Sequence, residues 1–163
     1  MKIQDKKEVL SQIREITKLE NKYWIKNIEV KRSEIAGNGV FAVDDLPAGT
    51  LIEFSPVLVY HHNTIDVLLD VYEKHILCDY QFRWKEDLLA LVFGYGEIYN
   101  HSNDPSVGYI MMTDENKIQG AAFFTLKPVK AGEELFVAYN DGDVAFDELG
   151  CRYKRKDESE FAD

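Results

Sequence analysis

The sequence predicts a mainly β protein of short strands, with an inserted helical segment and a helix at the N-terminus. Short apolar runs bounded by tight turns recur along most of the chain. Two Ala-Gly turns, Ala48-Gly49 and Ala131-Gly132, each lie just before an apolar strand. Strands and helices do not alternate regularly, so a doubly wound nucleotide-binding fold is not expected.

The composition fits one globular domain in a reducing compartment. The chain has 163 residues, of which 45% are hydrophobic, enough to bury a single core. Its two cysteines, Cys78 and Cys151, provide no disulfide framework. No apolar run approaches the ~20 residues of a membrane span, and the N-terminus is charged, unlike a signal peptide. We therefore expect an intracellular, cytoplasmic protein that contacts no membrane, or a nuclear one if it acts in a eukaryotic cell or a host.

The net charge of −10, from 19 basic and 29 acidic residues, favours cationic partners. Direct binding of nucleic acid is disfavoured, because lysine and arginine are needed to neutralise phosphates. A negative field instead attracts lysine-rich peptides. An acidic surface also serves solubility, so charge alone leaves both explanations open.

The N-terminal segment 5–20 predicts an amphipathic helix. Its apolar residues recur at helical spacing, with charged residues between them. They are Val9, Leu10, Ile13, Ile16 and Leu19. The pattern leaves open whether the helix packs on its own domain or on a partner, of which a second copy of the chain in a homodimer is one.

Strands are expected from residue 28 to residue 60. Apolar and charged residues alternate from Ile28 to Arg32, and a glycine pair opens a short apolar strand at 37–42. Residues 51–60 predict either one strand or two strands separated at Pro56, because proline cannot donate a ladder hydrogen bond.

The middle of the chain predicts an inserted helical segment at 64–93. Apolar residues in 64–76 have helical spacing, and 86–93 is compatible with a second short helix. Between them, Asp79 to Trp84 alternates aromatic and polar residues, which suits an exposed strand or an aromatic groove wall.

The C-terminal third predicts a hairpin and one further strand. Val107 to Thr113 and Ile118 to Leu126 are β-like runs around a turn at 114–117. A turn at 128–132 leads to a last strand at 135–139. The chain then becomes polar and charged, so we expect a tail.

A polar corner at 94–105 carries the densest side-chain chemistry. Asn100, His101 and Ser102 place an amide, an imidazole and a hydroxyl side by side. Pro105 ends the segment, because proline keeps the preceding residue out of helical geometry. From these residues alone, a ligand-holding corner and a simple Asn/Ser turn are both open.

Other common site patterns are weak in this sequence. Gly37-Asn38-Gly39 lacks the third glycine of a dinucleotide fingerprint. His75 and Cys78, with His61-His62 upstream, could in principle hold a metal ion. Since cysteine is commonly a buried apolar residue, we predict no metal site.

Three ordered motifs resemble those of SET-domain protein-lysine N-methyltransferases. They are Gly37 to Ala42, Tyr99 to Pro105 and Gly132 to Tyr139. The resemblance covers about residues 25–145 and is closest to the minimal SET proteins of viruses and bacteria. It implies S-adenosylmethionine-dependent methylation of a lysine amine on a basic protein or peptide, with histones as one candidate.

The resemblance also implies a fold and domain limits. A β-clip of small sheets would contain a pseudoknot that brings the second and third motifs together. The SET domain would span 23–146, including the inserted segment 64–93. The N-terminal helix would occupy 1–22 and the C-terminal tail 147–163.

Site residues follow from the same resemblance. S-adenosylmethionine would contact Gly37, Asn38, Gly39, Asn100 and His101. The substrate lysine would enter from the opposite face, near Tyr80, Tyr99 and Val137. Tyr139 would be catalytic, because its hydroxyl, together with backbone carbonyls of the channel, can orient a neutral amine. A dry channel beside the sulfonium would lower the lysine pKa from its usual ~10.4.

Three departures from the family pattern bear on function. Ser106 stands where the family often has an anchoring Asn. No aromatic residue lies in 140–145 to cover the cofactor, and Phe146 or Tyr153 are the candidate substitutes. Val137 replaces the Phe or Tyr that often limits methylation, so di- or trimethylation is expected. Two alternatives are an inactive SET-like module that binds S-adenosylmethionine or a basic peptide, and an interaction domain that dimerises through its N-terminal helix.

Overall fold

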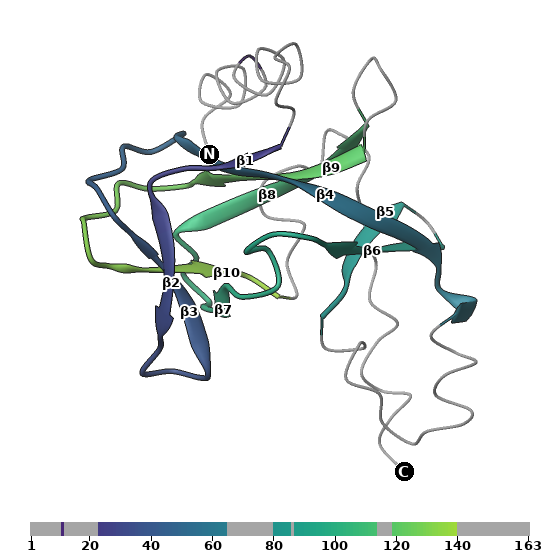
Figure 1. The fold of residues 1–163 in the computed structure, drawn as a ribbon, viewed down its shortest axis with the longest axis horizontal. Helices are drawn as coiled ribbons and strands as arrows, with labels where there is room; N and C mark the ends of the chain where they lie inside the picture. Colours follow the sequence, from purple (N-terminus) through teal and green to yellow (C-terminus); the bar gives the residue numbers. More distant parts are fainter. Residues whose placement is uncertain (1–10, 12–22, 65–79, 86, 114–118, 140–163) are drawn as a thin grey trace.

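The computed structural model describes residues 11, 23–64, 80–85, 87–113 and 119–139, which form two β-sheets (Figure 1). The larger sheet has the order β5-β6-β4-β9-β8, with β1 also paired to β4; the smaller has the order β2-β3-β10-β7. The larger sheet contains β1 (Trp24–Ile25), β4 (Leu51–His61), β5 (Phe82–Lys85), β6 (Leu88–Val92), β8 (Val107–Thr113) and β9 (Gln119–Thr125). The smaller contains β2 (Ile28–Arg32), β3 (Asn38–Ala42), β7 (Asn100–His101) and β10 (Glu134–Val137). The predicted mainly β class is confirmed.

Several predicted segments lie outside the described residues. They are nearly all of the N-terminal helix, the helical pattern at 65–76, the hairpin turn at 114–117 and the tail from 140 onward. No helix within the described ranges is long and apolar enough to cross a membrane.

Strand β4 is a single strand that changes its neighbour at Pro56. Residues from Leu51 to Pro56 pair with β9, and residues from Val57 to His61 pair with β6. The Pro56 carbonyl accepts a hydrogen bond of 2.8 Å from the Phe93 N–H. Proline therefore marks a change of pairing partner without ending the strand.

The predicted helix at 86–93 is wrong, because this segment contains strand β6. A short, continuously apolar run fits either a buried helix or a buried strand, and pairing decides between them. Here β6 is hydrogen-bonded to β4 on one side and β5 on the other. The exposed-strand alternative for 79–84 is confirmed in part, since β5 begins at Phe82, although Trp84 is buried.

The two Ala-Gly turns lie side by side and join the sheets. Gly49 and Gly132 have φ values of 80° and 85°, which glycine adopts most readily. Just before these turns, Leu46 and Val129 exchange backbone hydrogen bonds of 2.8 and 2.9 Å. One turn leads into β4 of the larger sheet and the other into β10 of the smaller sheet.

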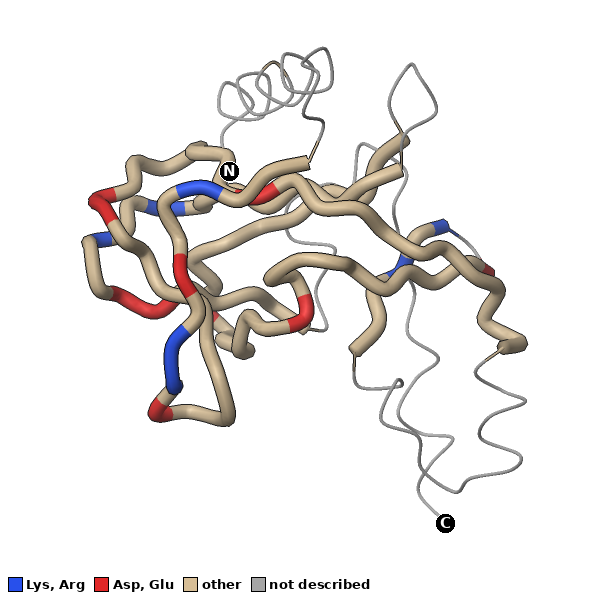
Figure 2. Tube along the Cα trace, viewed as in Figure 1, with Lys and Arg blue, Asp and Glu red and all other residues tan. Residues whose placement is uncertain are grey.

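Charged residues are concentrated in β2, the turns and the strand ends (Figure 2). The long strands β4, β8 and β9 contain one charged side chain, Glu53, which is 0% exposed. Around it, apolar residues of both sheets form the main core cluster, which includes Val40, Ile52, Phe123 and Leu135.

Candidate functional site

All three sequence motifs meet in the smaller sheet. Strand β10 pairs in parallel with β7, which places Phe136 opposite Asn100 and Val137 opposite His101. On its other edge, β10 pairs antiparallel with β3, where Leu135 lies opposite Val40. Figure 1 shows β3, β7 and β10 together below the long strands. The second and third motifs are therefore adjacent, as the expected pseudoknot requires.

Asn100 links the three motifs through its side-chain amide. It is 8% exposed, and its nitrogen lies 3.2 Å from the carbonyl oxygens of both Ala36 and Asn38. The shortest contact, 2.7 Å, is to Glu134 Oε1 at the start of β10. A carboxylate acceptor makes this hydrogen bond the strongest of the three.

The glycine loop fits the predicted cofactor site. A Cβ on Gly39 would lie 2.8 Å from Glu134 Cδ and 3.2 Å from Asn100 Nδ2, so a larger residue there would push the Glu134 carboxylate away from Asn100. Gly37 has a φ of 50°, which turns the backbone sharply before β3. Bare backbone here would let S-adenosylmethionine approach the main chain, whereas the Asn100 amide nitrogen and both His101 ring nitrogens are already hydrogen-bonded within the protein.

Tyr139 lies against His101. The Tyr139 N–H donates to His101 Nδ1 at 3.1 Å, and the two ring centroids are 5.2 Å apart. Because Nδ1 accepts this bond, the proton of the neutral imidazole belongs on Nε2, which lies 3.1 Å from Asn103 Oδ1. The predicted catalytic residue and a predicted cofactor-binding residue are thus in contact.

The Tyr139 hydroxyl donates to the Tyr99 carbonyl at 2.9 Å. Partial burial raises the pKa of Tyr139 above its usual value, and the nearby Tyr80 and Glu97 raise it further. The hydroxyl therefore stays protonated at neutral pH. Since its proton points to Tyr99, the oxygen lone pairs are free to accept a hydrogen bond from a substrate amine.

The three predicted substrate-binding residues have different surroundings. Tyr80 is 44% exposed and near enough to Tyr139 to influence its pKa. Tyr99 and Val137 are each only 1% exposed and belong to the main core cluster. Only the main-chain carbonyl of Tyr99 faces the Tyr139 hydroxyl, because its ring is stacked on Phe123 with centroids 5.2 Å apart.

The buried Glu53, which no motif in the sequence singles out, lies under the corner at 94–105. Its Oε2 accepts from the Tyr99 hydroxyl at 3.0 Å, and its Oε1 accepts from Ser55 Oγ at 2.7 Å and Tyr95 N at 2.8 Å. Desolvation raises the pKa of Glu53, while the hydrogen bonds from Ser55, Tyr95 and Tyr99 act in the opposite direction. A single charged residue within an apolar strand could have drawn attention to it.

Ser106 provides an anchor at the position where the family often has Asn. It is 5% exposed, and its N–H donates to the Phe136 carbonyl at 3.1 Å. Its hydroxyl accepts from the Phe136 N–H at 3.0 Å. Ser106 therefore fastens the middle of β10 through both its backbone and its side chain.

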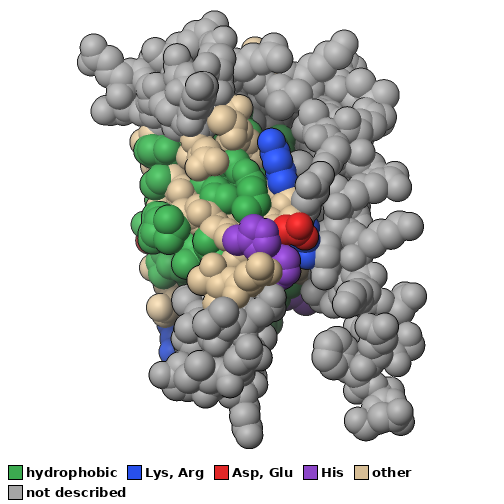
Figure 3. Space-filling view, turned by 90° about the vertical axis from the view of Figure 1, so that its right-hand side faces the viewer, with side chains coloured by type: hydrophobic (Ala, Val, Ile, Leu, Met, Phe, Trp, Pro, Cys, Tyr) green, Lys and Arg blue, Asp and Glu red, His purple; other side chains and the backbone are tan. Residues whose placement is uncertain are grey.

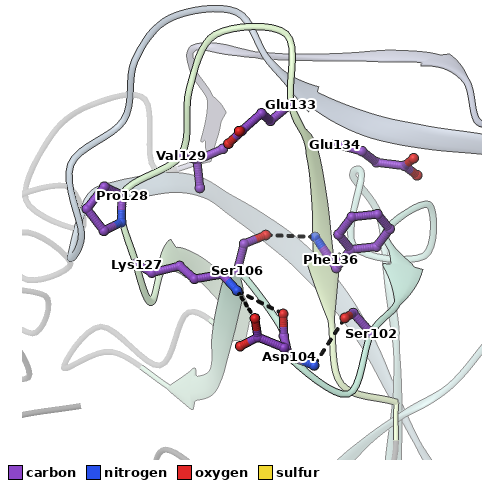
Figure 4. Close-up of a pocket in the computed structure, with 9 residues that line it drawn as sticks. All are labelled: Ser102, Asp104, Ser106, Lys127, Pro128, Val129, Glu133, Glu134 and Phe136. Atoms are coloured by element: carbon purple, nitrogen blue, oxygen red, sulfur yellow. Dashed lines mark hydrogen bonds and ion pairs between the residues drawn. The ribbon is translucent and has the colours of Figure 1, made fainter.

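A pocket of about 480 Å³ lies beside the predicted cofactor residues, not over them (Figure 4). Lys127 and Asp104 form an ion pair at one side of it, and Glu134 lies on the opposite side. Its lining residues are Ser102, Asp104, Ser106, Lys127, Pro128, Val129, Glu133, Glu134 and Phe136. The pocket borders the site through Glu134, which accepts from Asn100, and through Phe136, which lies opposite Asn100 in the parallel strand pair.

Two histidines and an aspartate gather on another face (Figure 3). The ligand atoms of His61, His62 and Asp87 lie within 4.8 Å of one another. Two ligands of one tetrahedral zinc ion are about 3.4 Å apart, whereas His62 Nδ1 and Asp87 Oδ1 are 4.0 Å apart. His75 and Cys78, the other residues of the metal-ligand grouping, lie outside the described residues.

Comparisons with known proteins agree with this arrangement. The SET domain family matches residues 37–140. A Schizosaccharomyces pombe protein, histone-lysine N-methyltransferase, H3 lysine-37 specific, is 33% identical over 118 residues. That alignment covers 70% of this chain and 74% of the yeast protein.

Solved structures show the same fold. One, from Plasmodium falciparum and assigned as a histone methyltransferase, gives a TM-score of 0.58 at 21% identity. It covers 72% of this chain and 96% of the other. A second, ctPRC2 in an autoinhibited conformation bound to S-adenosylmethionine, gives 0.60 at 23% identity, covering 73% of this chain and 16% of the other.

Proposed function

The chain belongs to the SET-domain family of protein-lysine N-methyltransferases, which use S-adenosylmethionine, and we propose that its substrate is a basic protein, with histones as the leading candidate. The yeast relative is named for a lysine of histone H3. The net charge of −10 favours encounter with a lysine-rich segment. An intracellular location, in the compartment that holds this substrate, is part of the same proposal.

The observation that carries the methyl-transfer part of the proposal is the Tyr139 hydroxyl, held by the Tyr99 carbonyl beside His101. When bound, S-adenosylmethionine supplies an electrophilic methyl group on a sulfonium. In this proposal Gly37, Asn38, Gly39, Asn100 and His101 would hold it. Tyr139 would accept a hydrogen bond from the substrate amine and so orient its nitrogen lone pair for methyl transfer, a contribution of orientation.

The substrate amine must be neutral to react. Free lysine has a pKa of ~10.4, so it is mostly protonated at neutral pH. A desolvated channel disfavours the ammonium form and lowers this pKa. Tyr139 and the Tyr99 carbonyl bind the amine without either becoming charged, so they do not reverse that effect.

Two sequence features favoured an inactive SET-like module, and the structure removes the first of them. The first ground was the replacement of an anchoring Asn by Ser106, yet Ser106 makes two hydrogen bonds to Phe136. The second ground was the absence of an aromatic residue at 140–145, and that segment lies outside the described residues. Active methyl transfer is therefore the better-supported interpretation.

Labelled S-adenosylmethionine and a panel of basic proteins, including core histones, test the proposal. We expect label on lysine side chains, located by mass spectrometry, with more transfer at pH 9 than at pH 7 because more amine is neutral. A peptide with the target lysine changed to arginine is the control. Cofactor binding without any transfer would support the inactive module, and the proposal would then fail.

A further inference from the structure

We propose that Glu53 is a positioning residue for methyl transfer, acting on Tyr139 through the Tyr99 carbonyl. The inference rests on the proposed function and adds a residue that lies outside the three motifs. Glu53 Oε2 accepts from the Tyr99 hydroxyl at 3.0 Å, and the carbonyl of the same tyrosine accepts from the Tyr139 hydroxyl at 2.9 Å. Tyr99 thus connects the buried carboxylate of Glu53 to the hydroxyl of Tyr139, the predicted catalytic residue.

The buried carboxylate of Glu53 needs hydrogen bonds from the residues around it. A buried carboxylate is strongly unfavourable unless hydrogen bonds replace its hydration. Glu53 is 0% exposed and accepts from two hydroxyls, those of Ser55 and Tyr99, and from the backbone of Tyr95 and Gly96. Because all four groups donate, they suit an ionised carboxylate. Any movement of the corner would break some of these bonds.

The start of the polar corner, at Gly94 to Gly96, packs closely around Glu53 and the core. A Cβ on Gly94 would collide with the side chains of Glu53 and Ser55. A Cβ on Gly96 would lie 2.7 Å from Val92 Cγ1 and 2.8 Å from Phe123 Cζ. The backbone before the second motif is therefore packed directly on the core and has little freedom to shift.

Glu53 affects Tyr139 by fixing the position of Tyr99, which lies between them. Tyr99 is fixed by Glu53 at its hydroxyl and by Phe123 along its ring, which leaves its carbonyl in one place. That carbonyl determines where the Tyr139 proton points. Misplacement of a reacting group by about 1 Å can lower a rate about 100-fold, so losing the Glu53 bond should affect the chemical step.

A purely structural role for Glu53 makes a different prediction. If Glu53 only stabilises the fold, its loss lowers activity by the same factor whether or not residue 139 carries a hydroxyl. If it positions Tyr139, its loss matters only when that hydroxyl is present. The two roles are therefore separated by a double-mutant cycle.

The experiment measures kcat, KM for S-adenosylmethionine and Tm for Tyr99→Phe and Glu53→Gln, each with Tyr or Phe at 139. In the Tyr139 background we expect kcat to fall about tenfold, with KM within about twofold. In the Tyr139→Phe background we expect a further change below about twofold. Tyr99→Phe keeps the stacked ring, so it carries the test if Glu53→Gln does not fold.

Thr125→Val is the matched control. Thr125 is also 0% exposed, and its hydroxyl donates to the Pro47 carbonyl at 2.6 Å, so its loss should lower Tm without lowering kcat. Unchanged kcat in both test variants, or equal losses in both backgrounds, would overturn the inference while the proposed function stands. No methyl transfer by the wild type would overturn both.

Discussion

At the scale of single residues, the site depends on bonds that link distant parts of the chain. Asn100 reaches Asn38 in the first motif and Glu134 in the third through one amide nitrogen. Its importance could be predicted from the motif, but its partners could not, because they depend on pairing between strands far apart in the sequence. Glu53 shows the same limit, since its four donors come from two segments.

The residue Glu97 should make folding stability depend on pH. Burial raises its pKa to about 7 from 4.5, while a hydrogen bond from the Val92 N–H acts in the opposite direction. The folded state thus binds this proton more tightly than the unfolded chain does. Its contribution to stability is full below about pH 4.5 and is lost as the pH rises through 7.

Denaturant unfolding of wild type and Glu97→Gln at pH 5 and pH 8 measures this effect. Relative to the glutamine variant, the wild type should lose stability on the order of 1 kcal/mol between the two pH values, a figure that allows for solvent screening of a half-buried carboxyl. Parallel stabilities of the two proteins across this range would contradict the assignment.

The small side chain of Val137 determines how many methyl groups we expect on the product lysine. It is smaller than Phe or Tyr and has no hydroxyl, so we expect di- or trimethyl-lysine from the wild type. If residue 137 borders the substrate amine as the family resemblance implies, a larger residue there should fill the space that methyl groups need; because Val137 is also buried in the core cluster, Tm is measured alongside. Val137→Phe should therefore shift the product toward monomethyl-lysine, as read by mass spectrometry. Exclusively monomethylated product from the wild type would contradict this prediction.

At the scale of elements, local sequence patterns predict where strands and turns lie better than they predict which strands pair with each other. Alternation and β propensity predict the strands from 28 to 32 and from 107 to 113, and β2 and β8 have these bounds. The segment 86–93 is mistaken for a helix because a short apolar run has no distinctive period. The change of partner at Pro56 depends on β6 and β9, which no local pattern in β4 reveals.

The turn before β10 should be sensitive to loss of glycine at 132. A Cβ at this position would have no neighbour within 4 Å, so the effect of substitution comes from the φ of 85° alone. We expect Gly132→Ala to lower the free energy of unfolding by about 1 kcal/mol. Gly132→Asn should cost less, because asparagine tolerates this conformation better. Equal stability of wild type and Gly132→Ala would contradict this account of the turn.

At the scale of the whole molecule, the negative charge should govern encounter with substrate. If attraction between an acidic enzyme and a basic protein speeds binding, added salt should screen it. We expect KM for a histone substrate to rise several-fold between about 50 and 300 mM salt, while KM for S-adenosylmethionine changes little. A histone KM that is independent of salt would argue against electrostatic attraction.

The whole fold could be expected only because three motifs occur in order. Composition and periodicity indicate a small β-rich domain, but they do not bring residues 37–42, 99–105 and 132–139 together. That meeting requires parallel pairing of β7 with β10 and antiparallel pairing of β10 with β3. Such pairings are long-range, and side-chain patterns within single segments do not specify them.

The most direct test of the central claim compares wild type with Tyr139→Phe in a methyl-transfer assay, with S-adenosylmethionine affinity measured by calorimetry. The phenylalanine variant loses the bond to the Tyr99 carbonyl and the acceptor for the substrate amine. We predict that kcat falls about 100-fold or more, while the Kd for S-adenosylmethionine stays within about twofold. An unchanged kcat would contradict the claim that Tyr139 orients the lysine amine.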